Sequence, residues 1–206
     1  MARDAALSPV AVAPSLVLAH AAAPPLPPPA ILATLLLVGG EVMLFAGLIF
    51  AFWVLRLAAP VWPPPLQPRL PIGVTGLNTL VLLASSATLT AALRARRRPD
   101  RAAFVRGLGL TATLGTLFLA VQGWEWVRLV GFGLTVTAGT YGALFYTLVG
   151  THAVHVLAAL AWLGATLARA RRDRWGGGPA RLYACALYWH FVVALWPILF
   201  VCVYLL

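Results

Sequence analysis

Five long stretches of mostly apolar residues constrain the fold of this chain more than any other feature. Each holds a window of 18 or more such residues, enough to cross about 30 Å of hydrocarbon at about 1.5 Å per helical residue. They lie near residues 30–55, 72–93, 104–127, 140–168 and 183–205. With 62% hydrophobic and 10% charged residues, the 206-residue chain cannot hide this surface in one soluble core. The chain therefore belongs in a lipid bilayer.

The backbone of these stretches must satisfy its own hydrogen bonds, because hydrocarbon offers no water to its amides. Only α-helices and closed β-barrels do so, and the stretches show no alternation of period two. We therefore predict an all-α integral membrane bundle of five transmembrane helices, forming one domain over residues 30–206. Residues 1–29 form a proline-rich segment before it, with "PPLPPP" at 24–29 favouring polyproline geometry.

All fifteen basic residues are arginine, and they are distributed unevenly between the two sides of the predicted bundle. Twelve fall on the side of the N-terminus and three on the other side. The positive-inside rule then places the N-terminus in the cytoplasm. The net charge of +10 is explained by these loops and by anionic headgroups, so we expect no nucleic-acid partner. The twelve are Arg3, Arg94, Arg96, Arg97, Arg98, Arg101, Arg106, Arg169, Arg171, Arg172, Arg174 and Arg181, against Arg56, Arg69 and Arg128.

One acidic residue, Glu41, stands in the middle of the first apolar stretch, in "GGEVMLFAGLIFAF". An unpaired acid at mid-helix costs about 2.5–3.5 kcal/mol on insertion scales, so it marks a functional site by default. It is either a carboxylate that handles protons or substrate, or a buried acid that hydrogen-bonds a neighbouring helix. The residues alone do not separate these two interpretations.

Three histidines are the available partners for Glu41. Counted from the cytoplasmic ends of the predicted helices, Glu41 lies about 17 Å deep, His155 about 20 Å, His152 about 24 Å and His190 about 11 Å. We expect His155 to be the partner of Glu41, with His152 as the second candidate. His190 lies where a lipid headgroup or a carbonyl can reach it.

A metal site of the chain's own is not expected. His152 and His155 share one helix face, but a complete site needs ligands from other helices, and few are available. Cys185 and Cys202 lie 17 residues apart on one predicted helix, about 25 Å, which is too far for a disulfide. We predict neither a bound metal nor a haem in this chain.

Glu125 lies at the outer end of the third apolar stretch, in "QGWEWVR", between Trp124 and Trp126. The flanking tryptophans are typical of a membrane interface. Arg128 follows three residues later on the same helix face, so we expect an interfacial ion pair. A role in proton exit or partner contact is the alternative.

The same segments resemble those of a known family. "GEVMLFAGLIFAF", "WPPP", "LNTLVLLASS", "TLGTLFLAVQGWEW", "YGALFYTLVGTHAVHV" and "YWHFVVALW" follow one another in the order found in subunit III of the haem–copper oxidases, cytochrome c oxidase subunit 3. Each is weak alone, but six in order over nearly all five stretches make a specific resemblance. It runs from about residue 31 to the end.

The resemblance implies the five-helix bacterial form of a non-catalytic subunit in the bacterial cytoplasmic (inner) membrane. Glu41 then stands at the family's intramembrane glutamate. Haem and copper belong to partner subunits, and this subunit packs against subunit I, with subunit II in the same complex. It also implies bound phospholipids, with Arg169 as a lipid-contacting arginine beside His190, and support for proton uptake and turnover.

One position departs from the family pattern. The family often reads "YWHFVDVVW", whereas Val193 occupies the aspartate position here. This departure leaves open a divergent branch, such as an accessory subunit of a nitric oxide reductase. A small free-standing membrane transporter is an alternative from another class, although five stretches with few ionisable groups offer little to line a polar cavity. An assembly factor would share the fold.

Overall fold

The computed structural model describes residues 27–65, 67–96, 100–172 and 178–206. These contain five long helices: α1 (Pro29–Ala58), α2 (Ile72–Arg96), α3 (Arg101–Gly131), α4 (Thr140–Arg171) and α5 (Gly178–Phe200). A π-helical turn, η1 (Val201–Leu205), continues α5 to the C-terminus. Each long helix is apolar enough to cross a membrane, so the predicted all-α bundle of five spans is confirmed. The segment predicted at 1–29 lies almost wholly outside the described residues.

The helices extend beyond the apolar stretches at their arginine-rich ends. α3 begins at Arg101, where the Asp100 side chain accepts a hydrogen bond of 2.8 Å from the Ala103 amide. Such an N-cap satisfies one of the free amides of the first turn. α5 begins at Gly178 rather than near 183. Hydropathy marks only the part of a helix inside hydrocarbon, and the polar first and last turns continue into the headgroup region.

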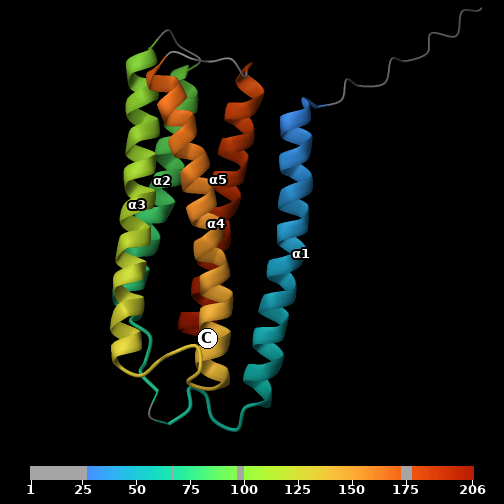
Figure 1. Ribbon diagram of the computed structural model, residues 1–206, viewed down its shortest axis with the longest axis vertical. Coiled ribbons are helices and arrows are strands. Elements are labelled where there is room, and N and C mark those ends of the chain that lie inside the picture. Colours follow the sequence, from blue (N-terminus) through green and yellow to red (C-terminus); the bar gives the residue numbers. More distant parts are fainter. Residues whose placement is uncertain (1–26, 66, 97–99, 173–177) are drawn as a thin grey trace, which may run out of the picture.

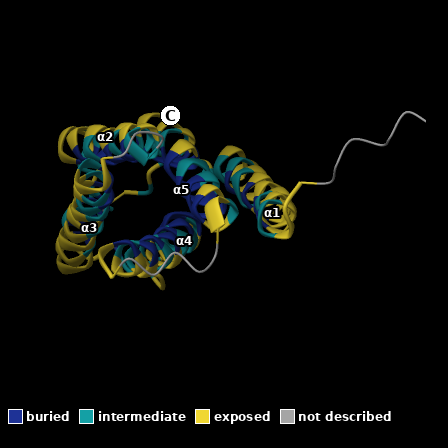
Figure 2. Ribbon diagram, turned by 90° about the horizontal axis from the view of Figure 1, so that it is seen from above, coloured by how far each residue is buried: buried dark blue, intermediate teal, exposed yellow. Residues whose placement is uncertain are grey.

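The five helices run alternately up and down, so the start of α1 lies at the same end as the loops that carry most arginines (Figure 1). We call this the arginine-rich end, and the opposite end, where the chain terminates, the C-terminal end. Seen along the bundle, α2, α3, α4 and α5 form a four-sided group, and α1 lies outside it against α5 (Figure 2). Half of the apolar window of α5 is buried, but only 17% of that of α1.

The core of the four-helix group is built from large aromatic side chains of α5 against small residues. Trp189 and Trp196 are each 1% exposed. The indole N–H of Trp189 donates to Ser85 Oγ at 3.2 Å, and that of Trp196 donates to Thr79 Oγ1 at 2.8 Å. Each tryptophan therefore buries its ring without leaving its polar atom unpaired. Gly115 of α3 makes room for Trp189, since an added Cβ would lie 2.5 Å from the ring.

We predict that Gly115→Leu destabilises the protein by about 1–3 kcal/mol, because Trp189 is held by its hydrogen bond and cannot move aside. The measurement is the thermal unfolding of the purified membrane protein. Gly109→Leu, on the same helix, is the control, since nothing lies within 4 Å of a Cβ there. Equal melting temperatures for the two variants would contradict this packing.

Candidate functional site

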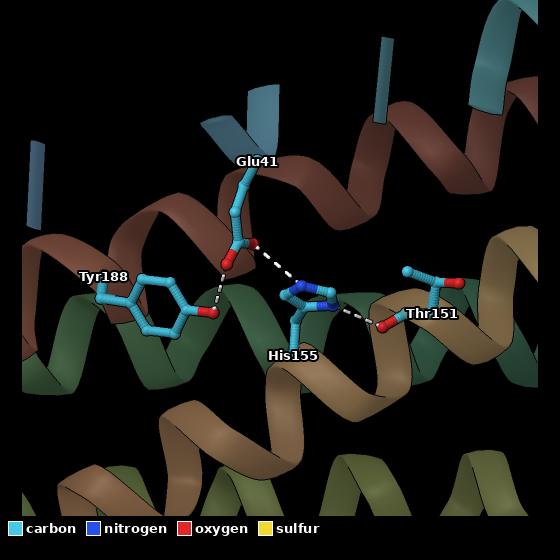
Figure 3. A network of polar contacts seen from close by, with 4 residues as sticks. All are labelled: Glu41, Thr151, His155 and Tyr188. Carbon is cyan, nitrogen blue, oxygen red and sulfur yellow. Dashed lines mark hydrogen bonds and ion pairs between the residues drawn. The ribbon is translucent and has the colours of Figure 1, made fainter. Parts of the chain in front are cut away.

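Glu41 lies on the buried face of α1 and contacts two other helices (Figure 3). Its side chain points between α4 and α5, and the residue is 8% exposed. The Tyr188 hydroxyl of α5 donates to Oε1 at 3.0 Å. Oε2 lies 3.2 Å from Nε2 of His155 of α4, an ion-pair distance at which the ring nitrogen is not aligned for a hydrogen bond. The structure thus places Glu41 beside His155, one of its two expected partners.

The contact made by Nδ1 of His155 fixes the position of one proton on the ring. Nδ1 is 2.6 Å from the carbonyl oxygen of Thr151, and a carbonyl can only accept, so Nδ1 carries a proton. Nε2 of His155 and Oε2 of Glu41 are therefore the two positions where one further proton would make the pair neutral, as imidazolium with carboxylate or as imidazole with carboxylic acid. A neutral pair costs less in hydrocarbon than a charged one.

Aromatic side chains complete the surroundings of the pair. Glu41, Phe45 and Phe52 form the inward stripe of α1, at helical spacings of four and seven residues. The Phe45 ring meets His155 edge-on with centroids 5.3 Å apart, and it also lies edge-on to His152 at 6.3 Å. Phe45 therefore shields the acid and the imidazole from other polar groups.

His152, the second candidate partner of Glu41, points elsewhere. Its ring stacks on Trp196 of α5, with centroids 5.1 Å apart and planes 25° from parallel. The residue is 1% exposed, and neither ring nitrogen has a hydrogen-bond partner among the described residues. It therefore contributes to the core of the four-helix group and not to the pair on α1.

The remaining candidate residues lie apart from Glu41. Arg128 Nη1 is 3.3 Å from Oε1 of Glu125, and Glu125 is buried while Arg128 is half exposed. His190 Nδ1 is 2.6 Å from Ser86 Oγ of α2, so one of its nitrogens is already bonded within the bundle. Arg169 is exposed in the last turn of α4.

Tyr188 is the residue that the sequence reasoning missed. It stands in "YWHF", directly before Trp189 and His190. A depth count could have found it, because Tyr188 lies ten residues, about 15 Å, into α5, and Glu41 twelve residues, about 18 Å, into α1. A phenol at the depth of a buried acid is a candidate donor.

Metal-ligating groups do not converge in the described part of the chain. No set of three or more His, Cys, Asp or Glu side chains that could hold an ion occurs there. Cys185 and Cys202 are both free thiols. What the site around Glu41 can do chemically is to hold a proton between a carboxylate and an imidazole, or to pass it from one to the other.

The chain is similar to known proteins over most of its length. Residues 30–206 match the family model described as cytochrome c oxidase subunit III. A Synechocystis sp. protein named cytochrome c oxidase subunit 3 is 34% identical over 168 residues, covering 81% of this chain and 71% of the relative. The protein of that name from Bacillus subtilis is 34% identical over 83% of both chains. A Nocardia farcinica relative, named probable cytochrome c oxidase subunit 3, is 34% identical over 83% of this chain and 85% of its own.

We predict that Glu41→Gln leaves the stability of the protein nearly unchanged. The amide oxygen can still accept from Tyr188, and the amide nitrogen can donate to Nε2 of His155, as a protonated carboxyl would. Glu41→Ala leaves both partners without a bond and should cost about 1–3 kcal/mol. Thermal unfolding in lipid nanodiscs measures both. A Gln variant as unstable as the Ala variant would contradict the hydrogen-bonding role of the Glu41 side chain.

Proposed function

The chain belongs to the cytochrome c oxidase subunit III family, and we propose that it is the non-catalytic third subunit of a bacterial haem–copper oxidase, packed against subunit I beside subunit II. The match over residues 30–206 carries this proposal. Haem and copper reside in the partner subunits, and this chain supports the stability, lipid binding and sustained proton uptake of the complex. The matches favour neither a nitric oxide reductase accessory subunit nor a free-standing transporter.

The proposed membrane is the bacterial cytoplasmic membrane, with the arginine-rich end inside. Among the described residues, eight arginines lie at that end and three at the C-terminal end. The positive-inside rule then places the start of α1 in the cytoplasm. The eight are Arg94, Arg96, Arg101, Arg106, Arg169, Arg171, Arg172 and Arg181, and the three are Arg56, Arg69 and Arg128.

The outward face of α1 is the proposed contact with subunit I. Four residues spaced by seven, Leu36, Met43, Phe50 and Leu57, are between 70% and 78% exposed and form one stripe. Beside this stripe lie Gly40 and Gly47, where a Cβ would meet nothing within 4 Å. Exposed apolar residues are ordinary in lipid, but small residues flanking them let a second helix backbone approach closely.

We expect the chain to copurify with a haem-bearing large subunit when it is isolated through a tag in mild detergent. Gly40→Leu combined with Gly47→Leu should lower the haem recovered per tagged chain, because the larger side chains hold the partner helix away. Gly123→Leu, on α3 and equally open, serves as the matched control. A chain that purifies without haem as a functional monomer or homodimer would overturn the proposed function.

Glu41 serves in this proposal as a tie between helices. It joins α1, which carries the partner face, to α4 and α5 through His155 and Tyr188. By holding α1 in place, the neutral pair sets the packing against subunit I that sustained proton uptake requires. The pair need not carry protons to subunit I in order to do this.

Phospholipid headgroups are the proposed ligands of Arg169, at the arginine-rich end. Its guanidinium is exposed at the end of α4, and guanidinium groups match phosphate oxygens in pairs. His190 can join only through Nε2, since Nδ1 is bonded to Ser86. The headgroup contact therefore depends mainly on the arginine, with His190 as a weaker member.

Arg169→Ala should release tightly held phospholipid from the purified complex, because the phosphate loses its bidentate partner. Native mass spectrometry of the complex counts the lipids retained. Arg106→Ala removes an exposed arginine at the same end and is the control. Lipid counts that are the same in wild type and Arg169→Ala would contradict the site.

A further inference from the structure

Several buried polar atoms without partners gather near the C-terminal end of the four-helix group. Gln122 of α3 is 3% exposed, and its Nε2 donates to the Tyr204 hydroxyl at 3.2 Å, while its Oε1 has no partner among the described residues. Turning the amide over would only exchange which atom is left unpaired. One polar atom of Gln122 therefore lacks a protein partner in either orientation.

Other residues near Gln122 and Tyr204 also have buried polar atoms without a hydrogen-bond partner. Thr75 of α2 is 1% exposed and interacts with Tyr204, but Oγ1 has no aligned hydrogen bond. One turn along α3 from Gln122, the indole N–H of Trp126 also has no partner among the described residues, although its ring contacts Phe145 and Tyr146 of α4. Glu125 also lies within electrostatic reach of Tyr204. Deficits on α2 and α3 therefore converge on one residue of η1.

Such a concentration calls for a partner that is not protein. An unpaired buried polar group costs about 1–3 kcal/mol, and native proteins rarely leave several side by side. Other polar groups of the same interior are paired: Thr111 Oγ1, for example, donates to the Gly107 carbonyl at 2.9 Å and lies 2.8 Å from Thr88 Oγ1. The ring nitrogens of His152 are also unpartnered among the described residues, but they belong to one side chain, whereas the unpaired atoms near Tyr204 come from two helices.

A cavity borders this cluster at Tyr204. A pocket of about 230 Å³ opens at the C-terminal end, and Tyr204 and Tyr141 are part of its lining, with Arg56 and Arg69 also on its wall. Its size exceeds the space that one water needs many times over. Tyr204 thus belongs both to the wall of the pocket and to the unpaired cluster.

The π-helical turn explains why Tyr204 takes this position. Pro197 inside α5 has no amide hydrogen, so the carbonyl of Val193 loses its helical donor. Four residues later the chain widens into η1, closed by the Leu206 amide on the Val201 carbonyl at 3.1 Å. Within η1, Val203 and Tyr204 are buried against the group.

We propose that the C-terminal end of the four-helix interior is a water-binding site. Bound waters hydrogen-bond to Gln122, Thr75 and the Tyr204 hydroxyl, and they exchange with bulk water through the pocket beside Tyr141. A water makes about three hydrogen bonds at such sites, which matches the convergence of groups from α2, α3 and η1. The site does not depend on the proposed oxidase function.

X-ray radiolysis of the full chain in nanodiscs tests this site, because hydroxyl radicals formed from bound water oxidise the side chains beside it. Tyr204, 6% exposed, should be oxidised several-fold faster than Trp189, which is 1% exposed with its N–H bonded to Ser85. Oxidation of Tyr204 no faster than that of Trp189 would overturn the proposal.

Variants distinguish water that is bound to Gln122 and Thr75 from bulk water that enters the pocket without binding there. Thr75→Val, which keeps the shape of the side chain, and Gln122→Leu should each lower the oxidation of Tyr204 several-fold. Thr111→Val is the matched control, since the Thr111 hydroxyl is bonded within the protein, and it should leave Tyr204 unchanged. If Gln122→Leu does not fold, Thr75→Val alone decides. Oxidation of Tyr204 that neither variant lowers would overturn the proposal.

Discussion

The position of α1 depends on one constraint, the need of a carboxylate at mid-membrane for partners inside the protein. Glu41 finds them in Tyr188 of α5 and His155 of α4, the two helices against which α1 mainly packs. Phe45 and Phe52 extend the same stripe from the acid towards the C-terminal end of the bundle and add apolar contact there. Because the rest of α1 faces outward, its rotation about its own axis is set mainly by this stripe.

The four-helix group is stabilised by hydrogen bonds between helices. In these bonds the hydroxyl and amide side chains of α2 pair with indole rings of α5 and with the backbone of α3. Ser85 and Thr79 accept from the two buried tryptophans of α5, and Asn78 donates to the Phe118 carbonyl of α3 at 3.0 Å. Val193, 2% exposed, lies in this core at the position where the family often has aspartate. An acid there would need a partner of its own, and valine removes that need.

The sequence predicted the number and kind of helices because hydropathy over 18 or more residues is a strong signal, and it predicted their ends less well because the last turns are polar. Depth counts brought Glu41 and His155 to matching levels, since rise per residue is fixed. A depth count gives the height of a residue in the membrane but not the direction in which its side chain points. Three residues turn a helix by about 300°, so His152 and His155 point about 60° apart. That difference sends His155 towards α1 and His152 onto Trp196. The bond between Ser86 and His190 was hidden for the same reason, since it depends on which faces of α2 and α5 meet.

The pairing of Glu41 with residues late in the chain has a consequence for biogenesis. Tyr188 follows Glu41 by 147 residues, so α1 reaches the bilayer during translation well before this donor exists. In that interval the acid has no partner in the chain, and its cost of about 2.5–3.5 kcal/mol must be offset by the apolar residues around it, at about 0.3–0.6 kcal/mol each. The leucine-rich flanks of α1 are therefore a requirement of membrane insertion, since they must hold the helix in lipid until α4 and α5 supply the partners of the acid.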